Sequence, residues 1–149
     1  ILDRTGMPTR RVVQQLNTDY GWNLDPESVK AAKDEAYYRI KPQMGIKPIP
    51  AVYKIAKSAR GKMPMAIGTG STNKSAMDTL TTLGVVDWFG AIVTADDVTE
   101  HKPHPETYLK CAEILKVDPA VCVVFEDGVF GIEAAKAAGM HAIDVRPYV

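Results

Sequence analysis

Three short polar segments of this chain contain residue types that could act together on a phosphate group. Residues 68–73 combine glycines with hydroxyl side chains, and Lys102 stands between two histidines and next to a proline. Glu126 and Asp127 are adjacent acids that follow an apolar run. Hydroxyls can hold an oxyanion, a fixed lysine can neutralise it, and carboxylates suit a magnesium ion. Together these groups could stabilise a phosphoryl group during its transfer.

Each segment also has an interpretation that involves no ligand. Residues 68–73 could form a tight turn with a hydroxyl cap, Lys102 could be a solvated loop residue, and residues 126–127 could be an acidic turn. His101 and His104 are three positions apart, but the sequence offers no third metal ligand nearby, so a solvated loop is the better interpretation for both. A joint site therefore depends on whether the fold brings the three segments together.

The elements around these segments predict a parallel sheet with helices on both faces. Apolar runs alternate with amphipathic helical stretches through the second part of the chain, which is typical of an α/β fold. Strands are predicted at 63–68, 91–93, 121–125 and 141–145, and helices at 52–59, 72–83, from Pro105 to Leu115, and 129–138. The run 121–125 is nearly all apolar, as in a strand buried on both faces. The polar segments follow three of the strands, so we expect them to meet at the carboxyl edge of the sheet.

The first part of the chain is predicted to be helical and separate from the sheet. Asp25 and Pro26 form a good N-cap and first residue for a helix. Residues 41–50 contain three prolines and a glycine, which disfavour helix and indicate a hinge. We therefore expect a helical part over residues 1–48 and an α/β core over residues 49–149.

The composition argues against several classes of partner. Lys and Arg number 18 and so do Asp and Glu, so no overall field attracts nucleic acid or a membrane. No apolar run approaches the roughly 20 residues that a membrane helix needs, and the start lacks the layout of a secretory signal. Cys111 and Cys122 are expected to be free thiols in a reducing compartment. We expect a cytoplasmic protein with a local phosphate site.

The three segments resemble motifs two, three and four of the haloacid dehalogenase superfamily. The similar stretches are residues 65–71, residues 102–108, and residues 124–128 with 131–140, and the likeness extends over about residues 6–145. The branch that contains beta-phosphoglucomutase and fructose-1-phosphate phosphatase is the most similar. The resemblance implies a Rossmann-like core and a helical cap that closes over the site.

The resemblance implies a role for each residue that would contact the phosphoryl group. Thr69 would donate a hydrogen bond to it, and the backbone amides of Gly70 and Ser71 would assist. Lys102 would neutralise both the phosphoryl group and the nucleophile.

The resemblance also implies metal and substrate contacts. Asp127 would bind Mg²⁺ directly, and Glu126 would act through a water molecule or from the second layer around the ion. Asn73 matches a position that contacts substrate phosphate. Thr9 and Arg10 lie in a stretch similar to the substrate-reading loop of the cap, although a solvated side chain is an equal alternative for Arg10. The implied substrate is a small phosphorylated sugar or similar metabolite.

The chain departs from the family at the nucleophile. In the family, a strand ending in Asp-x-Asp precedes the cap and lies at the centre of the sheet, but no Asp-x-Asp occurs in this sequence. Asp3 begins a stretch similar to the nucleophile motif of the pump ATPases, yet only two residues precede it, whereas a strand needs about five. We expect an upstream segment to carry the nucleophile. Without this strand, unpaired edges would favour a homodimer or strand exchange.

The expected activity is magnesium-dependent hydrolysis of a sugar phosphate through an aspartyl-phosphate. Two alternatives stay open. One is a phosphosugar mutase, which half a cap does not distinguish from a phosphatase and which would require a glucose 1,6-bisphosphate. The other is a truncated phosphate-binding module without catalytic activity.

Overall fold

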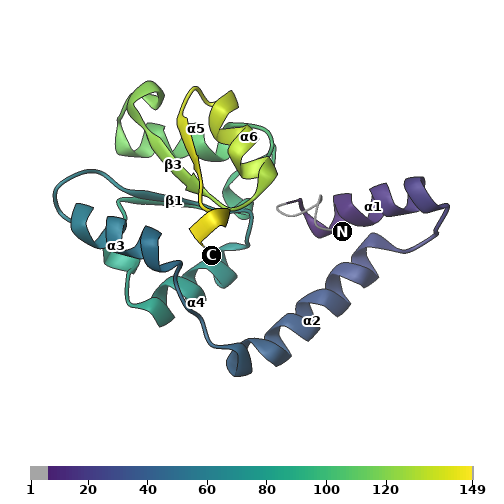
Figure 1. The fold of residues 1–149 in the computed structure, drawn as a ribbon. Helices are drawn as coiled ribbons and strands as arrows, with labels where there is room; N and C mark the ends of the chain where they lie inside the picture. Colours follow the sequence, from purple (N-terminus) through teal and green to yellow (C-terminus); the bar gives the residue numbers. More distant parts are fainter. Residues whose placement is uncertain (1–6, 149) are drawn as a thin grey trace.

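A pair of helices and an α/β core make up the fold (Figure 1). The structure, a computed structural model, describes residues 7–148, and the side chains of residues 41–44 lie outside that description. The helices are α1 (Thr9–Tyr20), α2 (Pro26–Met44), α3 (Pro50–Ala59), α4 (Asn73–Leu83), α5 (Glu106–Leu115) and α6 (Val129–Ala137), and the strands are β1 (Ala66–Gly68), β2 (Ala91–Val93), β3 (Val123–Glu126) and β4 (His141–Asp144). None of the helices in the described part of the chain is long and apolar enough to cross a membrane.

The described strands form two parallel pairs. Ala66 of β1 lies opposite Ala91 of β2, and Val123 of β3 lies opposite His141 of β4. Within residues 7–148, no ladder joins β1 to β3. The predicted α/β fold with parallel strands and flanking helices is confirmed. β1 and β3 are the two strands between which the sequence predicts a further, central strand, and each has an unpaired edge in the described chain.

One face of the β3–β4 pair is covered and the other is open. α5 and α6 supply the core cluster against which Val124 and Ala142 pack. The opposite face carries Val123 and Ile143, with exposed fractions of 51% and 41%, and Val121 before the strand is 74% exposed. The prediction of a strand buried on both faces is therefore wrong for the described residues. An apolar sequence allows a strand to be buried on both faces, but burial also requires an element that covers each face. The described chain leaves this face open.

Several helix ends follow from local sequence signals. The Asp25 carboxylate accepts a hydrogen bond from the amide of Ser28 at 2.9 Å and caps α2 as predicted. Thr72 caps α4, which therefore begins at Asn73. Gly84 ends α4 in the left-handed conformation, with a φ of 66° that favours glycine.

α2 is longer than predicted. It continues through Pro42 to Met44, although the sequence predicts that the hinge begins at Lys41. A proline disfavours a helix because it lacks an amide proton and its ring crowds the preceding turn, but this average preference does not fix where an individual helix ends. Gly45, with a φ of 65°, is the residue at which α2 ends. The proposed domain boundary near residue 48 stays a prediction.

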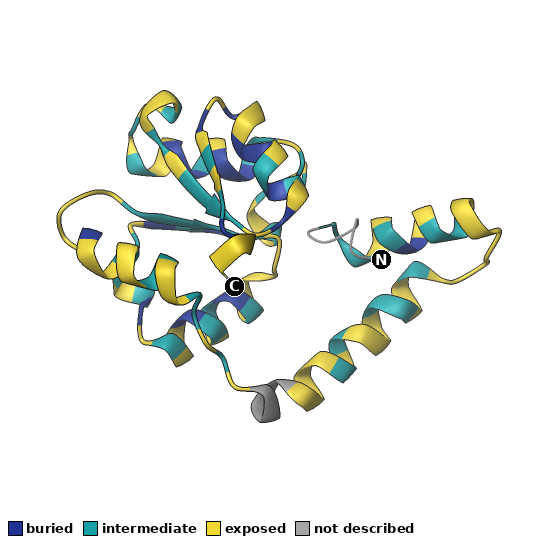
Figure 2. Cartoon of the chain, viewed as in Figure 1, coloured by how far each residue is buried: buried dark blue, intermediate teal, exposed yellow. Residues whose placement is uncertain are grey.

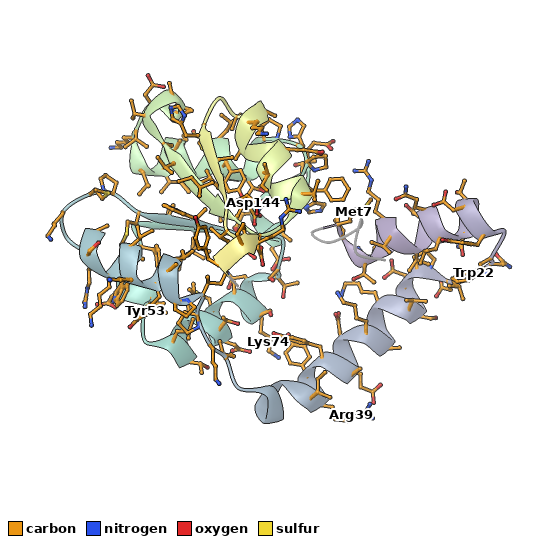
Figure 3. All side chains as sticks on the ribbon, in the orientation of Figure 1. Met7, Trp22, Arg39, Tyr53, Lys74 and Asp144 are labelled. Atoms are coloured by element: carbon orange, nitrogen blue, oxygen red, sulfur yellow. The ribbon has the colours of Figure 1, made fainter. Side chains whose placement is uncertain are left out.

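α1 and α2 pack on each other and approach the core at two places. Val13 is the buried residue of α1, and Figure 2 shows most of the remaining surface of both helices as exposed or half-buried. The ammonium of Lys74 on α4 lies 5.4 Å from the ring centre of Tyr38 on α2, and Figure 3 shows Lys74 directed toward that helix. At the other place, Arg11 of α1 and Phe130 of α6 line one pocket.

Candidate active site

Polar groups that follow β1, β2 and β3 meet at one end of the core. The side-chain nitrogen of Lys102 lies 3.2 Å from the carbonyl oxygen of Gly68, where β1 ends, and 2.8 Å from Oε1 of Glu126, where β3 ends. The lysine thus connects the two strand pairs at their carboxyl ends. The three segments meet as the sequence predicts, and the roles assigned to their residues stay predictions.

Lys102 is buried, and its loop is fastened to α5. Its side chain is 7% exposed. The carboxylate of Glu106, in the first turn of α5, accepts hydrogen bonds from the amides of Thr99 and Glu100 at 3.0 and 2.7 Å. These bonds fix the loop that leads to Lys102. A buried ammonium is costly unless it is paired and hydrogen-bonded. The position of the Lys102 charge therefore depends on the groups that surround it.

Tyr108 completes a cluster of three buried or nearly buried polar side chains. Its hydroxyl oxygen accepts a hydrogen bond from Lys102 at 2.7 Å, and its hydroxyl proton is directed to Oε1 of Glu126 at 3.2 Å. An ammonium has three protons, and Tyr108, Glu126 and the Gly68 carbonyl accept all three. We refer to Lys102, Tyr108 and Glu126 as the lysine cluster. The sequence predicts only that Tyr108 is a buried helix residue, but a buried tyrosine hydroxyl needs a polar partner, and that signal could have found it.

Both carboxylate oxygens of Glu126 are occupied. Oε1 accepts from Lys102 and Tyr108, and Oε2 accepts from the amides of Asp127 and Gly128 at 2.7 and 3.3 Å. Burial raises the pKa of this carboxyl, but Lys102 and the amides outweigh burial and bring the pKa below its ordinary value. Glu126 is therefore an anion that orients the lysine and the following loop. Its four acceptor sites are filled, which is compatible with an indirect rather than a direct contact to a metal ion.

Two glycines make room for the lysine cluster. A Cβ at position 131 would lie 1.7 Å from Oε1 and 2.2 Å from Cδ of Glu126. A Cβ at position 68 would lie 3.0 Å from the ring of Tyr108. Gly131 and Gly68 thus allow α6 and β1 to approach the cluster closely.

Asp127 is the acid of this site that a cation would fit. Burial raises the pKa of its carboxyl, and the charge of Glu126 raises it further. No cationic side chain in residues 7–148 pairs with it by a hydrogen bond or ion pair, so a bound cation would offset the repulsion between the two acids. The described residues gather no group of three or more His, Cys, Asp or Glu side chains. Magnesium typically uses one or two carboxylates, several waters and substrate phosphates, so Asp127 fits as one of its ligands.

The loop after β1 presents a hydroxyl group. The amide of Thr69 donates to the carbonyl of Val93 at 2.9 Å and extends the pairing of β1 with β2. The Thr69 hydroxyl oxygen accepts from the amide of Ser71 at 3.1 Å, which orients the hydroxyl while its proton stays available. The Ser71 amide, predicted to assist phosphate binding, thus already donates its hydrogen bond within the loop, to Thr69. The Gly70 amide has no hydrogen-bond partner among the described residues.

An acid from the loop after β2 occupies the backbone amide of Asn73. Oδ2 of Asp96 accepts from this amide at 2.8 Å. The carboxylate therefore satisfies one of the free amides at the start of α4, where an anion would otherwise bind. Only the side chain of Asn73 is left for the predicted substrate contact. Asp96 is 23 positions away from Asn73, and no local pattern pointed to this contact.

Asp97, in the same loop, is expected to make stability depend on pH. Its carboxylate accepts from the hydroxyl and the amide of Thr94 at 2.6 and 2.8 Å, and these two bonds lower its pKa. A lowered pKa stabilises the fold above the ordinary value of about 4, and this stabilisation is lost as the pH falls through the folded-state value. Asp97→Asn should lower the midpoint of thermal unfolding at pH 7 by about 2 °C.

The difference from wild type should shrink as the pH falls below about 4. Circular dichroism melts across that range measure it, and Glu113→Gln, on the exposed side of α5, is the control. A difference that stays constant with pH would contradict a role for the ionised Asp97.

The two residues of α1 predicted to contact substrate are bonded to α2. Arg10 pairs with the carboxylate of Glu27, to which its Nη2 donates at 2.7 Å. The hydroxyl oxygen of Thr9 accepts from Lys33 at 3.0 Å. Arg10 therefore faces α2, as the solvated alternative allows, and it is not directed to the core.

Arg11 is the arginine of α1 that faces the core. It lines an open pocket of about 390 Å³ together with Gln14 and Thr18 of α1 and Phe130 of α6. Arg11 makes no hydrogen bond or ion pair within residues 7–148. Adjacent positions on a helix point about 100° apart, so the rotation of α1 about its axis decides whether Arg10 or Arg11 faces the core. The sequence does not give this rotation, and Arg11 was therefore missed.

Comparison with known proteins identifies the family. The model of the family described as haloacid dehalogenase-like hydrolase matches residues 1–145. The chain belongs to this family. The resemblance on which the sequence analysis relied is thus confirmed, and the protein is a member of a family of enzymes.

Relatives of this haloacid dehalogenase-like hydrolase include a phosphatase and a mutase. The fructose-1-phosphate phosphatase YqaB of Escherichia coli strain K12 is 45% identical over 141 residues, which are 95% of this chain and 74% of that protein. The beta-phosphoglucomutase of Bacillus subtilis strain 168 is 40% identical over 79 residues, which are 53% of this chain and 35% of that protein.

A solved structure shows the same fold. The crystal structure of beta-phosphoglucomutase from Clostridium difficile matches this hydrolase with a TM-score of 0.69 and 25% identity. The match covers 95% of this chain and 66% of that chain. The chain thus spans about two thirds of the solved mutase and three quarters of the phosphatase.

Proposed function

We propose that the protein is a magnesium-dependent phosphatase that acts on a small phosphorylated sugar. The observation that carries the proposal is the buried ammonium of Lys102, held between the ends of β1 and β3. Thr69, whose hydroxyl is oriented by the Ser71 amide, directly follows Gly68, and Asp127 directly follows Glu126. A fixed cation and a hydroxyl donor at one end of a sheet are suited to stabilise the charge of a transferring phosphoryl group. The likeness to a fructose-1-phosphate phosphatase over 95% of the chain supports this substrate class.

Each residue has a separate part in the proposed reaction. Thr69 donates its hydroxyl proton to a phosphoryl oxygen, and the amide of Gly70 lies next in the same loop. Lys102 brings positive charge to the phosphoryl group, and Glu126 holds Lys102 in place. Asp127 would hold magnesium, which supplies further positive charge for the phosphoryl oxygens when bound.

The nucleophile of the proposed reaction is an aspartate outside residues 7–148. The edges of β1 and β3 are unpaired in the described chain, and Lys102 contacts the ends of both strands. We place the aspartate on a strand between them. Its attack forms an aspartyl-phosphate and breaks the ester bond to the sugar, whose oxygen takes up a proton as it leaves. Water then attacks phosphorus and releases inorganic phosphate and the free aspartate. Asp3, the other candidate, lies outside the described residues.

Phosphate release by the full-length protein tests the proposal. A panel of hexose and pentose monophosphates should be hydrolysed in the presence of Mg²⁺, and EDTA should lower the rate at least about a hundredfold. The absence of turnover in a folded protein that still binds phosphate would favour a non-catalytic module. Conversion of beta-glucose 1-phosphate that requires glucose 1,6-bisphosphate would favour a mutase, a possibility raised by the match to beta-phosphoglucomutase.

Arg11 is expected to contribute to substrate binding more than to the chemical step. We transfer to Arg11 the role predicted for Arg10, because Arg11 lines the pocket and Arg10 is paired with Glu27. Arg11→Ala should raise KM for the best sugar phosphate about tenfold and change kcat little, since a bond to the sugar end is made equally in the ground and transition states.

An aryl phosphate lacks the sugar, so its KM should change by less than about twofold in Arg11→Ala. Steady-state kinetics with both substrates measure this, and Arg10→Ala is the matched control. A lower kcat with unchanged KM, or an equal effect of Arg10→Ala, would contradict the transfer of the role.

A further inference from the structure

The hydroxyl of Tyr108 holds the two other members of the lysine cluster together. It is the acceptor of the shortest of the three bonds from Lys102, at 2.7 Å, compared with 2.8 Å to Glu126 and 3.2 Å to the Gly68 carbonyl. The same hydroxyl donates to Glu126 at 3.2 Å. A single group therefore contacts both partners of the ion pair.

Packing accounts for the ring of Tyr108 but not for its hydroxyl. The ring lies against Gly68, where an added Cβ would be 3.0 and 3.1 Å from two of its carbons, and it belongs to the core cluster of α5 and α6. Phenylalanine would fill this space equally well. Tyr108 is 6% exposed, and a buried hydroxyl is unfavourable unless it forms hydrogen bonds. Its two bonds to the lysine cluster supply that compensation.

The position of the Lys102 ammonium depends on these bonds. A lysine side chain has four flexible carbon–carbon bonds and a compact charge, so it adopts one position only where acceptors surround it. Without the hydroxyl, two acceptors are left, and both lie at strand ends. The third proton would then turn to water or to another oxygen, and the charge would no longer have one fixed position.

We propose that the Tyr108 hydroxyl is a positioning group, which fixes the Lys102 ammonium between the ends of β1 and β3. This inference rests on the proposed function, in which that ammonium stabilises the transferring phosphoryl group. Tyr108 acts through Lys102 and does not itself contact the substrate. Its effect is therefore on the transition state, where the placement of a charge matters most.

A double-mutant cycle in the full-length protein tests the proposal. Tyr108→Phe should lower kcat about tenfold, with KM within about twofold, as expected when the charged Lys102 loses its hydrogen bond to the hydroxyl. In the Lys102→Met background, the same change should alter the residual kcat/KM by less than about twofold, because the group through which Tyr108 acts is gone. A role in packing alone would give equal losses in both backgrounds and would overturn the proposal.

Tyr53→Phe is the matched control. Tyr53 is half-buried on α3, its ring lies 5.3 Å from that of Trp88, and its hydroxyl has no hydrogen bond within the described chain. Assays well below the melting temperature of each variant keep loss of folding apart from loss of rate. Unchanged kinetics in Tyr53→Phe and a tenfold lower kcat in Tyr108→Phe are the expected pair of results.

Crystal structures of the wild type and Tyr108→Phe distinguish failure of this proposal from failure of the proposed function. The ammonium of Lys102 should be displaced from its wild-type position in the variant, with its third proton turned to water or to another oxygen, whatever the activity. If the wild type hydrolyses no phosphate ester, the proposed function fails and this displacement alone decides the positioning role. A lysine that stays in place in Tyr108→Phe overturns the positioning role in either case.

Discussion

Replacement of Lys102 by methionine is expected to lower kcat/KM about a thousandfold, at the upper end of what one preorganised electrostatic group contributes. Methionine keeps much of the length of the side chain and removes its charge. The change also leaves Glu126, whose side chain is 14% exposed, as an anion without its cation. A buried charge without a partner is costly, so the free energy of unfolding should fall by about 3 kcal/mol. Phosphate-release kinetics and urea unfolding measure the two effects.

The activity loss and the stability loss can be separated in a second variant. Lys102→Met combined with Glu126→Gln removes the unpaired charge, so much of the stability should return while the activity stays low. Lys54→Met, on the exposed side of α3, should change neither quantity. Near-normal turnover by Lys102→Met would show that the proposed phosphatase does not depend on this ammonium.

Gly131→Ala is expected to damage both stability and activity, although an alanine inside a helix normally stabilises it by about 1 kcal/mol. The new methyl group would lie 1.7 Å from Oε1 of Glu126. The carboxylate is the end of a flexible side chain, but it can retreat only by giving up its four hydrogen bonds. We expect a loss of about 2 kcal/mol in unfolding free energy and a kcat about a hundredfold lower, because Lys102 loses its carboxylate partner.

Gly139→Ala is the matched control for Gly131→Ala. Gly139 follows α6 with a φ of 75°, and an added Cβ there would have no neighbour within 4 Å. Alanine should cost about 1 kcal/mol of backbone strain and leave kcat unchanged. If Gly131→Ala were stable and fully active, the position of Glu126 would not matter for turnover. Urea unfolding and steady-state kinetics on both variants decide this.

The parts of the fold that depend on local signals were predictable from the sequence. Asp25 caps α2 and Gly84 ends α4 because each makes its contacts within a few residues. The exposure of Val123 was not predictable in this way, because it depends on which elements cover β3. The end of α2 at Met44 was missed since a proline signals a break only by average preference.

The meeting of the candidate site residues was predictable where a residue lies in the segment that follows a strand. Thr69, Lys102 and Asp127 were singled out because the ends of parallel strands meet at one edge. Tyr108 and Asp96 were missed because their contacts depend on how distant segments pack. Tyr108 reaches Glu126 across 18 positions, and Asp96 reaches Asn73 across 23.

A ligand that binds the Lys102 ammonium must replace one of the hydrogen-bond acceptors that the ammonium already has. Each of its three protons already has an acceptor inside the chain, and the carbonyl of Gly68, at 3.2 Å, is the most distant of them. An incoming group obtains a hydrogen bond from the ammonium only if it is a stronger acceptor than that peptide oxygen. A phosphate dianion meets this condition because charged acceptors bind more strongly, whereas an uncharged sugar hydroxyl does not. Once the ester bond is broken, the dephosphorylated sugar offers only uncharged hydroxyls, which do not displace Gly68. It therefore has no bond to the lysine that would delay its departure.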